Sequence, residues 1–375
     1  EISLGLVGSE MCIRDRSIIE KCILEYNEEK PSKNTAVVVA DPSNGEILGM
    51  ASYPTFNLND PRKLTGMYTD EEIKDMSDEE YRNNLYSLWT NYCVSESYEP
   101  GSTFKPVTVA SALEEGVVKD GDTYVCKGFE TVADYKLKCH VFSTIGSHGS
   151  LTVEQALMNS CNPYMIHLAL EMGNSRFAYY QSLFGFGKIT GIDLPGETTG
   201  IVYGDRMTTI DAACNSFGQT INVNMMQMMA AYCSIINGGM LYQPHIVKRI
   251  ESANGEVVKE YKANLVRQTI TASTSKLLRR YLKNTVEEGT AKKAGVTGYS
   301  VAGKTGTAQK GDRKDNKWII SFIGHAPAEN PKFAIYVVID EPYGTTGTSG
   351  SSADVLTLTH LSLIHISEPT RPRLI

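Results

Sequence analysis

The strand-forming runs of this chain gather at its two ends, and this separation constrains the fold more than any other feature. Near the start, SIIEKCILEYNEE (17–29) predicts a short amphipathic helix. The stretch TAVVVADPSNGEILGMAS (35–52) then places two β-rich runs on either side of a strong turn signal, which predicts a hairpin. In the last third, three further runs follow one another: YSVAGKTGTAQ, KWIISFIGHAP and KFAIYVVIDEP. Short polar turns join them, including residues 311–316, and such short connections are typical of an antiparallel meander.

The stretch between the two sets of strands is mainly helical. Caps and apolar periodicity predict helices over about 102–116, 152–159, 162–173 and 272–288, and the methionine-rich run at 224–239 is typical of a core helix. Strands at both ends with helices between them predict an α+β fold. We expect one antiparallel β-sheet flanked by helices, with a mostly helical subdomain inserted between the hairpin and the C-terminal strands.

The stretch YEPGSTFKP (98–106) marks the start of one of these helices. Pro106 has no N–H and would clash with a preceding turn, so a helix that contains it must begin at about Ser102. Lys105 then lies one turn on, on the same face. The free N–H groups of the helix start would stabilise a developing oxyanion, and a buried lysine of lowered pKa could take the serine proton.

The pattern Ser-x-x-Lys is too common to identify a nucleophile by itself. The chain holds a second copy, Ser273 and Lys276, which also lies at a predicted helix start, where serine is a frequent N-cap. Further polar residues are therefore needed to identify a catalytic site.

Two such sets follow in order along the chain. Ser160 and Asn162 lie in NSCN, at the predicted break between two helices, where polar side chains can point into a cleft, although Asn162 could simply cap the second helix. Lys304, Thr305, Gly306 and Thr307 follow on the first of the late strands. Ser-x-x-Lys, Ser-x-Asn and Lys-Thr-Gly in this order are the signature of penicillin-binding proteins and class A β-lactamases.

The chain resembles the transpeptidase domain of class B penicillin-binding proteins over roughly residues 17–356. The stretches VVVADPSNGEILGMASYPTFN, YEPGSTFKP, FGQTINVNMMQMMAAYCSIINGG and GHAPAENPKFAIYVVID carry this resemblance. It implies a peptidoglycan D,D-transpeptidase, a serine acyltransferase that cross-links stem peptides ending in D-Ala-D-Ala and that β-lactams inhibit covalently. It also implies an N-terminal membrane anchor, a location on the outer face of the bacterial cell membrane, and a membrane-embedded glycan polymerase as partner.

The resemblance implies a role for each residue of the signature. Ser102 would attack the penultimate D-alanine carbonyl, with Lys105 as the base. Ser160 would relay a proton to the leaving amine, and Asn162 would hold a substrate amide and fix Lys105. For substrate binding, Lys304 would add positive charge beside Ser160, Thr305 and Thr307 would bind the terminal carboxylate, and Gly306 would leave the strand bare for the ligand. The oxyanion hole would use the backbone N–H groups of Ser102 and Thr307.

Three other activities use the same serine chemistry. A class A β-lactamase needs a Glu-x-x-Leu-Asn pattern after Ser-x-Asn, and none follows here; the nearest shape, from Glu80, precedes Ser102. A D,D-carboxypeptidase would use water as acceptor and is not excluded by spacing, but the class B framing sequences disfavour it. A β-lactam sensor of this fold usually has a hydrophobic residue where Asn162 stands.

Charge and cysteine spacing exclude other classes of site. The net charge of −7, with no basic run among aromatics, argues against nucleic acid as a partner. The eight cysteines form no C-x-x-C pair and no Cys/His cluster with zinc spacing, so we expect no metal and no cofactor. Cys126 and Cys139 flank a hairpin-like stretch and are either a local disulfide or two free thiols.

The two termini carry no periodic pattern. Residues 1–16 and 361–375 resemble translated sequencing-adapter read-through. We therefore expect a domain over 17–356 between two tails that are foreign to the natural protein. We expect the natural protein to be longer and to carry the anchor.

Overall fold

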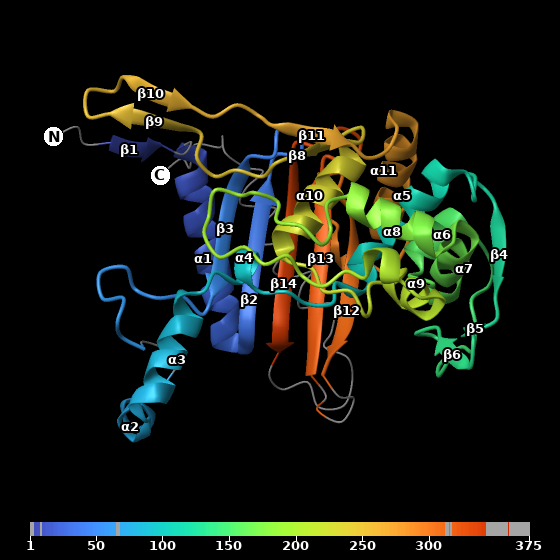
Figure 1. Ribbon diagram of the computed structural model, residues 1–375, viewed down its shortest axis with the longest axis horizontal. Coiled ribbons are helices and arrows are strands. Elements are labelled where there is room, and N and C mark those ends of the chain that lie inside the picture. Colours follow the sequence, from blue (N-terminus) through green and yellow to red (C-terminus); the bar gives the residue numbers. More distant parts are fainter. Residues whose placement is uncertain are drawn as a thin grey trace.

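The structure is a computed structural model that describes residues 4–7, 10–64, 68–311, 315, 317–342 and 359, with side chains from residue 17 onward. A five-stranded antiparallel sheet, in the order β12-β13-β14-β2-β3, forms its centre (Figure 1). The strands are β1 (Leu4–Val7), β2 (Ser32–Ala40), β3 (Ile47–Tyr53), β4 (Thr123–Cys126), β5 (Phe129–Val132), β6 (Tyr135–Lys138), β7 (Gly149–Thr152), β8 (Met240–Tyr242), β9 (Arg249–Ser252), β10 (Val257–Glu260), β11 (Leu265–Gln268), β12 (Ala302–Lys310), β13 (Lys317–Ala326) and β14 (Phe333–Pro342).

The central sheet joins the two ends of the chain, as predicted. β2 and β3 form the N-terminal hairpin, with Val38 opposite Met50, and β12, β13 and β14 form the C-terminal meander. β14 then pairs with β2, with Val337 opposite Val37, so the last strand closes onto the first. This pairing confirms the α+β fold and places everything between β3 and β12 outside the sheet.

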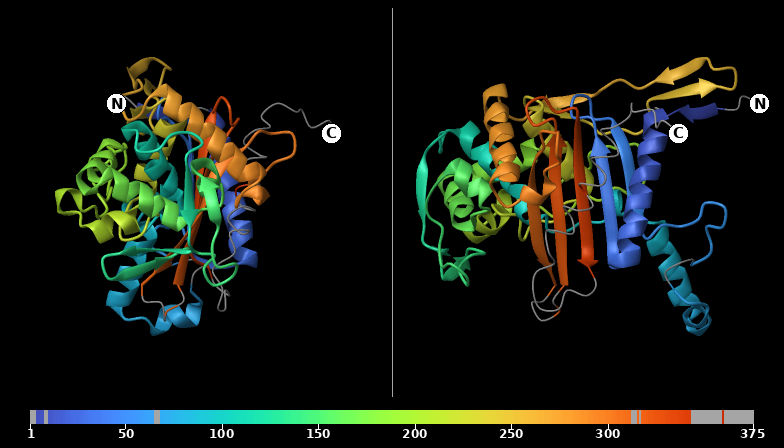
Figure 2. Two further views of the ribbon diagram at one scale, coloured as in Figure 1. Left: turned by 90° about the vertical axis from the view of Figure 1, so that its right-hand side faces the viewer. Right: turned by 180° about the vertical axis from the view of Figure 1, so that it is seen from behind.

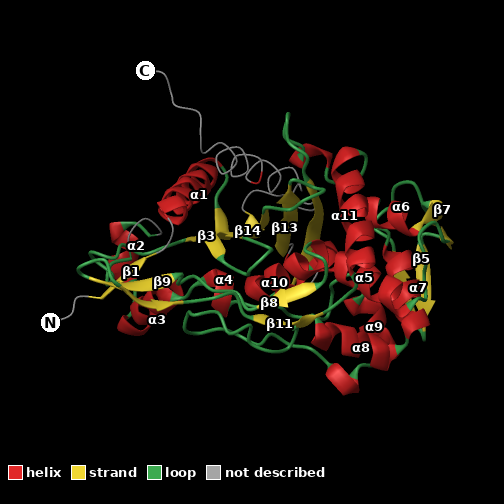
Figure 3. Ribbon diagram, turned by 90° about the horizontal axis from the view of Figure 1, so that it is seen from above, coloured by secondary structure: helices red, strands yellow, loops and turns green. Residues whose placement is uncertain are grey.

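Both faces of the sheet are covered. On one face Val37, Val39 and Phe322 pack with apolar residues of α1 and of the segment after α11. On the other face Val38 and Tyr336 belong to the large core that includes α4, α5, α7 and α10. Figure 3 shows α1 on one side of the sheet and α4 and α10 on the other. Burial on two faces explains why β2 and β14 are almost continuously apolar rather than alternating.

Eleven α-helices and three short 3-10 helices lie among the described residues. Most of those between β3 and β12 gather beyond the β12 edge of the sheet, while β1, β9 and β10 lie beyond the β3 edge (Figures 1 and 2). The helices are α1 (Glu10–Glu29), α2 (Asp70–Asp75), α3 (Asp78–Trp89), α4 (Tyr92–Ser95), η1 (Gly101–Phe104), α5 (Lys105–Glu115), α6 (Val153–Met158), α7 (Asn162–Met172), α8 (Asn174–Leu183), η2 (Gly204–Arg206), α9 (Thr209–Asn215), α10 (Met225–Ile236), α11 (Ala272–Glu287) and η3 (Lys292–Ala294).

The predicted helix boundaries hold to within a few residues, with three differences. The helix expected to begin at Ser102 is a 3-10 turn, η1, that passes into α5 at Lys105 and ends at Gly116, which has a positive φ of 77°. Cys161, not Asn162, is the N-cap position of α7, so Asn162 is the first helical residue. α1 begins at Glu10, before the predicted start at residue 17.

The division of the chain into a domain and two tails stays a prediction. Residues 361–375 lie outside the described part of the chain. In the first segment, Leu4–Val7 pairs with Arg249–Ser252, an arrangement that the patternless sequence did not suggest. No helix in the described residues has both the length and the apolar character needed to cross a membrane.

A buried histidine ties α10 to the end of β13. His325 is fully buried, its Nδ1 lies 2.8 Å from the hydroxyl of Tyr232, and its Nε2 lies 3.2 Å from the carbonyl of Ala328. These partners fit one neutral tautomer, in which Nε2–H donates to Ala328 and Nδ1 accepts from Tyr232. Burial lowers the pKa of His325 to about 3, and the nearby charge of Arg279 contributes.

We predict that His325→Gln weakens the pH dependence of stability below neutrality. Between its unfolded pKa of 6.5 and its folded pKa of about 3, His325 binds a proton only in the unfolded chain. Its contribution to the free energy of unfolding is therefore fully present above pH 6.5 and falls as the pH falls. His325 alone should lower the free energy of unfolding by about 2 kcal/mol between pH 7 and pH 5. Urea unfolding at both pH values measures the loss, and His167→Gln is a matched control. An equal loss in His325→Gln and wild type would refute the assignment.

Candidate active site

Ser102 lies in η1, against the edge of the central sheet. Its hydroxyl accepts a hydrogen bond from the hydroxyl of Ser160, with the two oxygens 3.0 Å apart. Gly101, with a φ of 56°, turns the chain into η1, and its N–H donates to the carbonyl of Gly218. Ser102 is partly exposed while its neighbours Gly101 and Thr103 are buried. The hydroxyl is therefore held on a rigid turn yet remains accessible.

Lys105 is fully buried, and its ammonium group is held by three acceptors. Nζ lies 2.6 Å from the carbonyl oxygen of Ser160, 3.0 Å from the Ser160 hydroxyl and 2.6 Å from Oδ1 of Asn162. These three bonds use all three protons of the ammonium group. No described residue forms an ion pair with Lys105, so uncharged acceptors alone balance its charge.

Burial lowers the pKa of Lys105 to about 8. The Cys161 and Cys139 thiols act in the opposite direction and raise this pKa, but by less. With this pKa, about one amine in ten is neutral at pH 7, compared with fewer than one in a thousand for an exposed lysine. A neutral amine in this position can accept a proton from Ser102 through the Ser160 hydroxyl that connects them.

Ser160 occupies the break between α6 and α7 in a strained conformation. Its φ of 55° is in the left-handed region, which a residue with a side chain seldom adopts. Strain of this kind costs about 1–3 kcal/mol and persists only where the surroundings enforce it. Here it directs both the carbonyl and the hydroxyl of Ser160 toward Lys105. The capping box of Thr152 and Gln155 fixes the start of α6, as the sequence predicted.

β12 carries the third set of residues and is an edge strand of the sheet. Lys304 is fully buried, its Nζ donates to the carbonyl of Thr305, and burial together with the charge of Lys105 holds its pKa well below the ordinary value. Thr305 is buried, whereas Thr307 is partly exposed. β12 pairs with β13 alone in the central sheet, and η1 packs against it.

Glycine at position 306 is required by the protein's own packing. A Cβ atom at Gly306 would lie 2.5 Å from Oγ of Ser321, 2.8 Å from the Thr103 methyl group and 2.9 Å from the carbonyl of Pro100. A Cβ at Gly101 would likewise meet the Thr307 carbonyl at 2.6 Å. Ligand approach was the expected reason for the bare strand at Gly306, and its close neighbour on this face is η1. This contact places the backbones of Ser102 and Thr307 beside each other.

The structure therefore gathers the predicted residues from three elements far apart in sequence. Ser102, Lys105, Ser160 and Asn162 form one hydrogen-bonded chain. The second Ser-x-x-Lys pair does not join it: Ser273 is exposed on the first turn of α11 and contacts Thr271, and Lys276 is exposed on the same helix. The roles of the gathered residues are taken up below.

The sequence spacing did not reveal one feature of this region. The cysteine spacing suggested no Cys/His cluster, but Cys126, Cys139, His148 and Cys161 place their ligand atoms within 4.8 Å of one another, and both Cys126 and Cys139 are free thiols. Cys161 stands between Ser160 and Asn162, so this cluster lies directly behind the site. Its members lie at the end of β4, at the two ends of the loop between β6 and β7, and at the start of α7, and for this reason no short spacing could reveal it.

Comparison with known proteins identifies the family. The family model for the penicillin-binding protein transpeptidase domain matches residues 35–357. The chain is 39% identical to stage V sporulation protein D of Bacillus subtilis over 337 residues, covering 88% of this chain and 49% of that protein. It is 31% identical to peptidoglycan D,D-transpeptidase FtsI of Escherichia coli over 316 residues, covering 83% of this chain and 47% of that protein. The chain thus spans about half the length of these curated relatives.

The fold also matches solved structures. Penicillin-binding protein 3 of Mycobacterium tuberculosis, complexed with ampicillin, superposes with a TM-score of 0.77 at 26% identity, covering 93% of this chain and 75% of that one.

We predict that Gly306→Ala destabilises the protein, because the added methyl group has no space between β12 and η1. The free energy of unfolding should fall by about 1–3 kcal/mol, as is usual when a close-packed interior is overfilled. Gly295→Ala is the matched control, since a Cβ there would meet its nearest atom at 3.3 Å. Denaturant unfolding measures both variants. Equal stability of Gly306→Ala and wild type would contradict the close approach of η1.

Proposed function

The chain belongs to the penicillin-binding protein transpeptidase family, and we propose that it is a peptidoglycan D,D-transpeptidase that works through an acyl-enzyme on Ser102. The observation that carries this proposal is the hydrogen-bonded path from Ser102 through Ser160 to a buried Lys105 of lowered pKa. A serine next to a proton acceptor, which a third group in turn orients, is the arrangement of an activated nucleophile.

In the acylation step, Ser102 attacks the carbonyl of the penultimate D-alanine in a stem peptide. A bond forms between Oγ and the carbonyl carbon, and the serine proton moves to neutral Lys105. The peptide C–N bond then breaks, and the proton passes through Ser160 to the leaving amine of the terminal D-alanine. Asn162 keeps Lys105 in place, because its side-chain carbonyl accepts one of the three ammonium bonds.

The β12 edge serves substrate binding in this proposal. The backbone N–H groups of Ser102 and Thr307 form the oxyanion hole, a role supported by the close approach of Gly101, the residue before Ser102, to the backbone of Thr307. The hydroxyls of Thr305 and Thr307 bind the terminal carboxylate, with Lys304 supplying nearby positive charge. A cavity lined by Glu99, Thr220, Gln309 and Lys310, among others, adjoins this strand and offers room for the stem peptide.

In the second step, an amine of a neighbouring stem peptide attacks the carbonyl carbon of the acyl-enzyme. The ester bond to Ser102 Oγ breaks, a proton from the amine returns to Ser102, and the new amide bond is the cross-link. The mycobacterial relative is complexed with ampicillin, and we extend β-lactam binding to this chain because a β-lactam mimics D-Ala-D-Ala. From the family membership we also propose that the domain lies on the outer face of the cell membrane and works with a membrane-embedded glycan polymerase.

Hydrolysis is the main alternative outcome for the acyl-enzyme. A β-lactamase needs a carboxylate that prepares a water molecule, and no carboxylate is hydrogen-bonded to Ser102, Lys105 or Ser160 among the described residues. Transfer to an amine is therefore favoured over transfer to water.

We predict that a fluorescent penicillin labels the protein at one site and that the label persists for hours. Ser102→Ala should abolish labelling, and Lys105→Met should slow it at least about a thousandfold, because nucleophile and base act together. Ser273→Ala is the matched control and should label normally. Gel fluorescence and peptide mass spectrometry measure the reaction.

A stable adduct on the peptide containing Ser102 would support a transpeptidase. Rapid return of free protein with accumulating penicilloic acid would instead identify a β-lactamase. A label on the peptide containing Ser273 would overturn the site.

We further predict that Thr307→Val slows acylation by penicillin about tenfold or more while the melting temperature changes little. Valine has nearly the shape of threonine and suits a strand, but it removes the hydroxyl proposed to bind a carboxylate. Stopped-flow measurement of the second-order acylation rate tests the change. An unaltered rate would remove Thr307 from the carboxylate site.

A further inference from the structure

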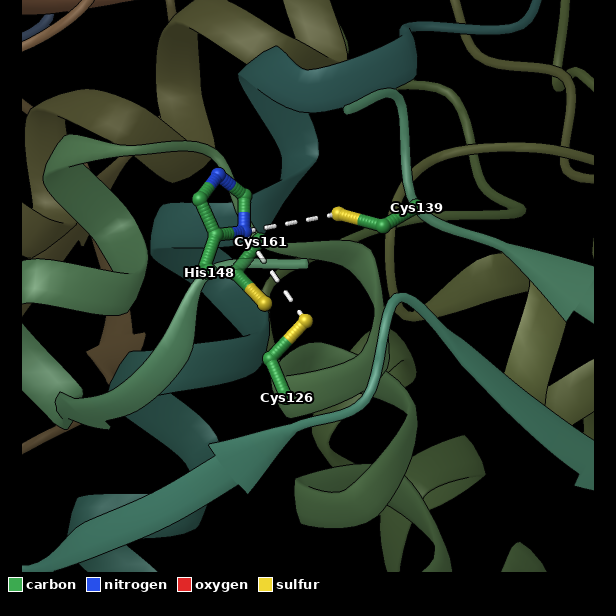
Figure 4. A group of neighbouring side chains, drawn as sticks. All are labelled: Cys126, Cys139, His148 and Cys161. Atoms are coloured by element: carbon green, nitrogen blue, oxygen red, sulfur yellow. Dashed lines mark hydrogen bonds between the residues drawn. The ribbon is translucent and has the colours of Figure 1, made fainter. Parts of the chain in front are cut away.

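Three cysteines and one histidine converge behind the turn that carries Ser160 (Figure 4). Cys126 ends β4, Cys139 follows β6, His148 precedes β7, and Cys161 caps α7. The three cysteines are almost completely buried, at 1%, 3% and 0% exposure, and His148 is half-buried. The path of the backbone therefore directs four metal-binding side chains at one point.

The spacing of the four ligand atoms matches a tetrahedral metal site. Nδ1 of His148 lies 3.6 Å from Sγ of Cys139 and 3.9 Å from Sγ of Cys126. A zinc ion with Zn–S bonds of about 2.3 Å and Zn–N bonds of about 2.0–2.1 Å requires ligand atoms about 3.6–3.8 Å apart. All four ligand atoms lie within 4.8 Å of one another, so small side-chain movements would complete the tetrahedron.

We propose that Cys126, Cys139, His148 and Cys161 bind one zinc ion in a structural site. Thiolate and imidazole ligands in a tetrahedral arrangement select zinc over magnesium, calcium or manganese, which prefer oxygen ligands. Four protein ligands leave no open position for water, which makes the site structural rather than catalytic.

The surroundings of the sulfur atoms favour bound thiolates. The N–H of Gly128 points at Sγ of Cys126, with nitrogen and sulfur 3.4 Å apart. N–H groups directed at sulfur stabilise a metal-bound thiolate and orient it, as outer partners of metal ligands commonly do.

A disulfide accounts for the cluster less well than a metal ion does. A bond between Cys126 and Cys139 would use two of the three sulfurs and would leave Cys161 and His148 without a role. Four ligands at one point are what a metal ion needs, whereas a disulfide needs two. His140 is the alternative histidine, since its Nδ1 lies 3.8 Å from Sγ of Cys139, but its side chain is exposed and it is not part of the cluster.

The position of Cys161 gives the zinc ion a consequence for the active site. Cys161 lies between Ser160 and Asn162, and these two residues hold the ammonium group of Lys105. The zinc ion would tie this strained turn to β4, to the β5–β6 hairpin and to the start of β7. It would thereby keep Ser160 in its left-handed conformation.

Metal analysis of the full chain tests the site directly. Protein purified under reducing conditions with zinc should contain about one zinc ion per chain by mass spectrometry of the metal. Reduced apoprotein titrated with Co²⁺ should develop the visible bands of tetrahedral cobalt–thiolate coordination, and Zn²⁺ should displace them. Zinc at about a hundredfold above its dissociation constant should raise the melting temperature by on the order of 5 °C.

Matched variants identify the ligands. Cys126→Ser and His148→Ala should each weaken zinc binding at least about a hundredfold, whereas Cys93→Ser and His140→Ala should bind normally. Cys93 is a buried cysteine outside the cluster. His148→Ala keeps the test decisive if a cysteine variant fails to fold, because His148 is only half-buried.

Two results would overturn the proposal. One is a reduced, folded protein that takes up neither zinc nor cobalt. The other is equal zinc binding by His148→Ala and His140→Ala.

The link to the active site rests on the proposed function and is tested separately. Removal of zinc with a chelator should slow penicillin acylation about tenfold or more, and zinc but not magnesium should restore the rate. Zinc-loaded protein that never labels would refute the transpeptidase assignment and leave the metal site standing. Metal-free protein that labels at the full rate would refute the link to the active site.

Discussion

The buried ammonium group of Lys105 is the interaction on which the candidate site depends. A charge in this position is tolerated only while Ser160 and Asn162 supply its three acceptors. Loss of these acceptors would leave buried N–H donors unsatisfied, which costs about 1–3 kcal/mol or more for a charged group. The same contacts join α5 to the break between α6 and α7. One charge therefore both orients the polar groups around Ser102 and holds two parts of the helical region together.

The second constraint is the close approach of η1 to β12. Gly101 lies against the backbone of Thr307, and Gly306 lies against Thr103 and the carbonyl of Pro100, with no space for a side chain at either position. Gly218 packs against Gly101 in the same way. Because the sheet edge and the helix start cannot move apart without breaking these contacts, Ser102 and Thr307 keep a fixed separation. Such rigidity is what preorganised N–H donors need, since they must not reorganise when charge develops.

The sequence predicted the elements well wherever a local signal existed. Pro106, Gly116 and the Thr152–Gln155 capping box located helix ends to within a few residues, because each acts through the backbone of its own turn. The turn residues at 41–45 and the β-branched runs predicted the hairpin for the same reason. The predicted start of α1 was wrong because no cap or helix breaker marks Glu10. The preceding strand, β1, depends on pairing with β9, which lies far along the chain.

The sequence by itself determined which residue types were available and in which local conformations: a serine in a tight turn, a lysine beside it, a break before Asn162, and a strand containing Gly306. The tertiary structure alone decided what these residues meet. It buried Lys105 and so lowered its pKa, forced Ser160 into a left-handed conformation, and set η1 against Gly306. It also brought Cys126, Cys139, His148 and Cys161 to one point. Burial, strain and convergence arise from contacts between distant segments, and no local pattern in the chain encodes them.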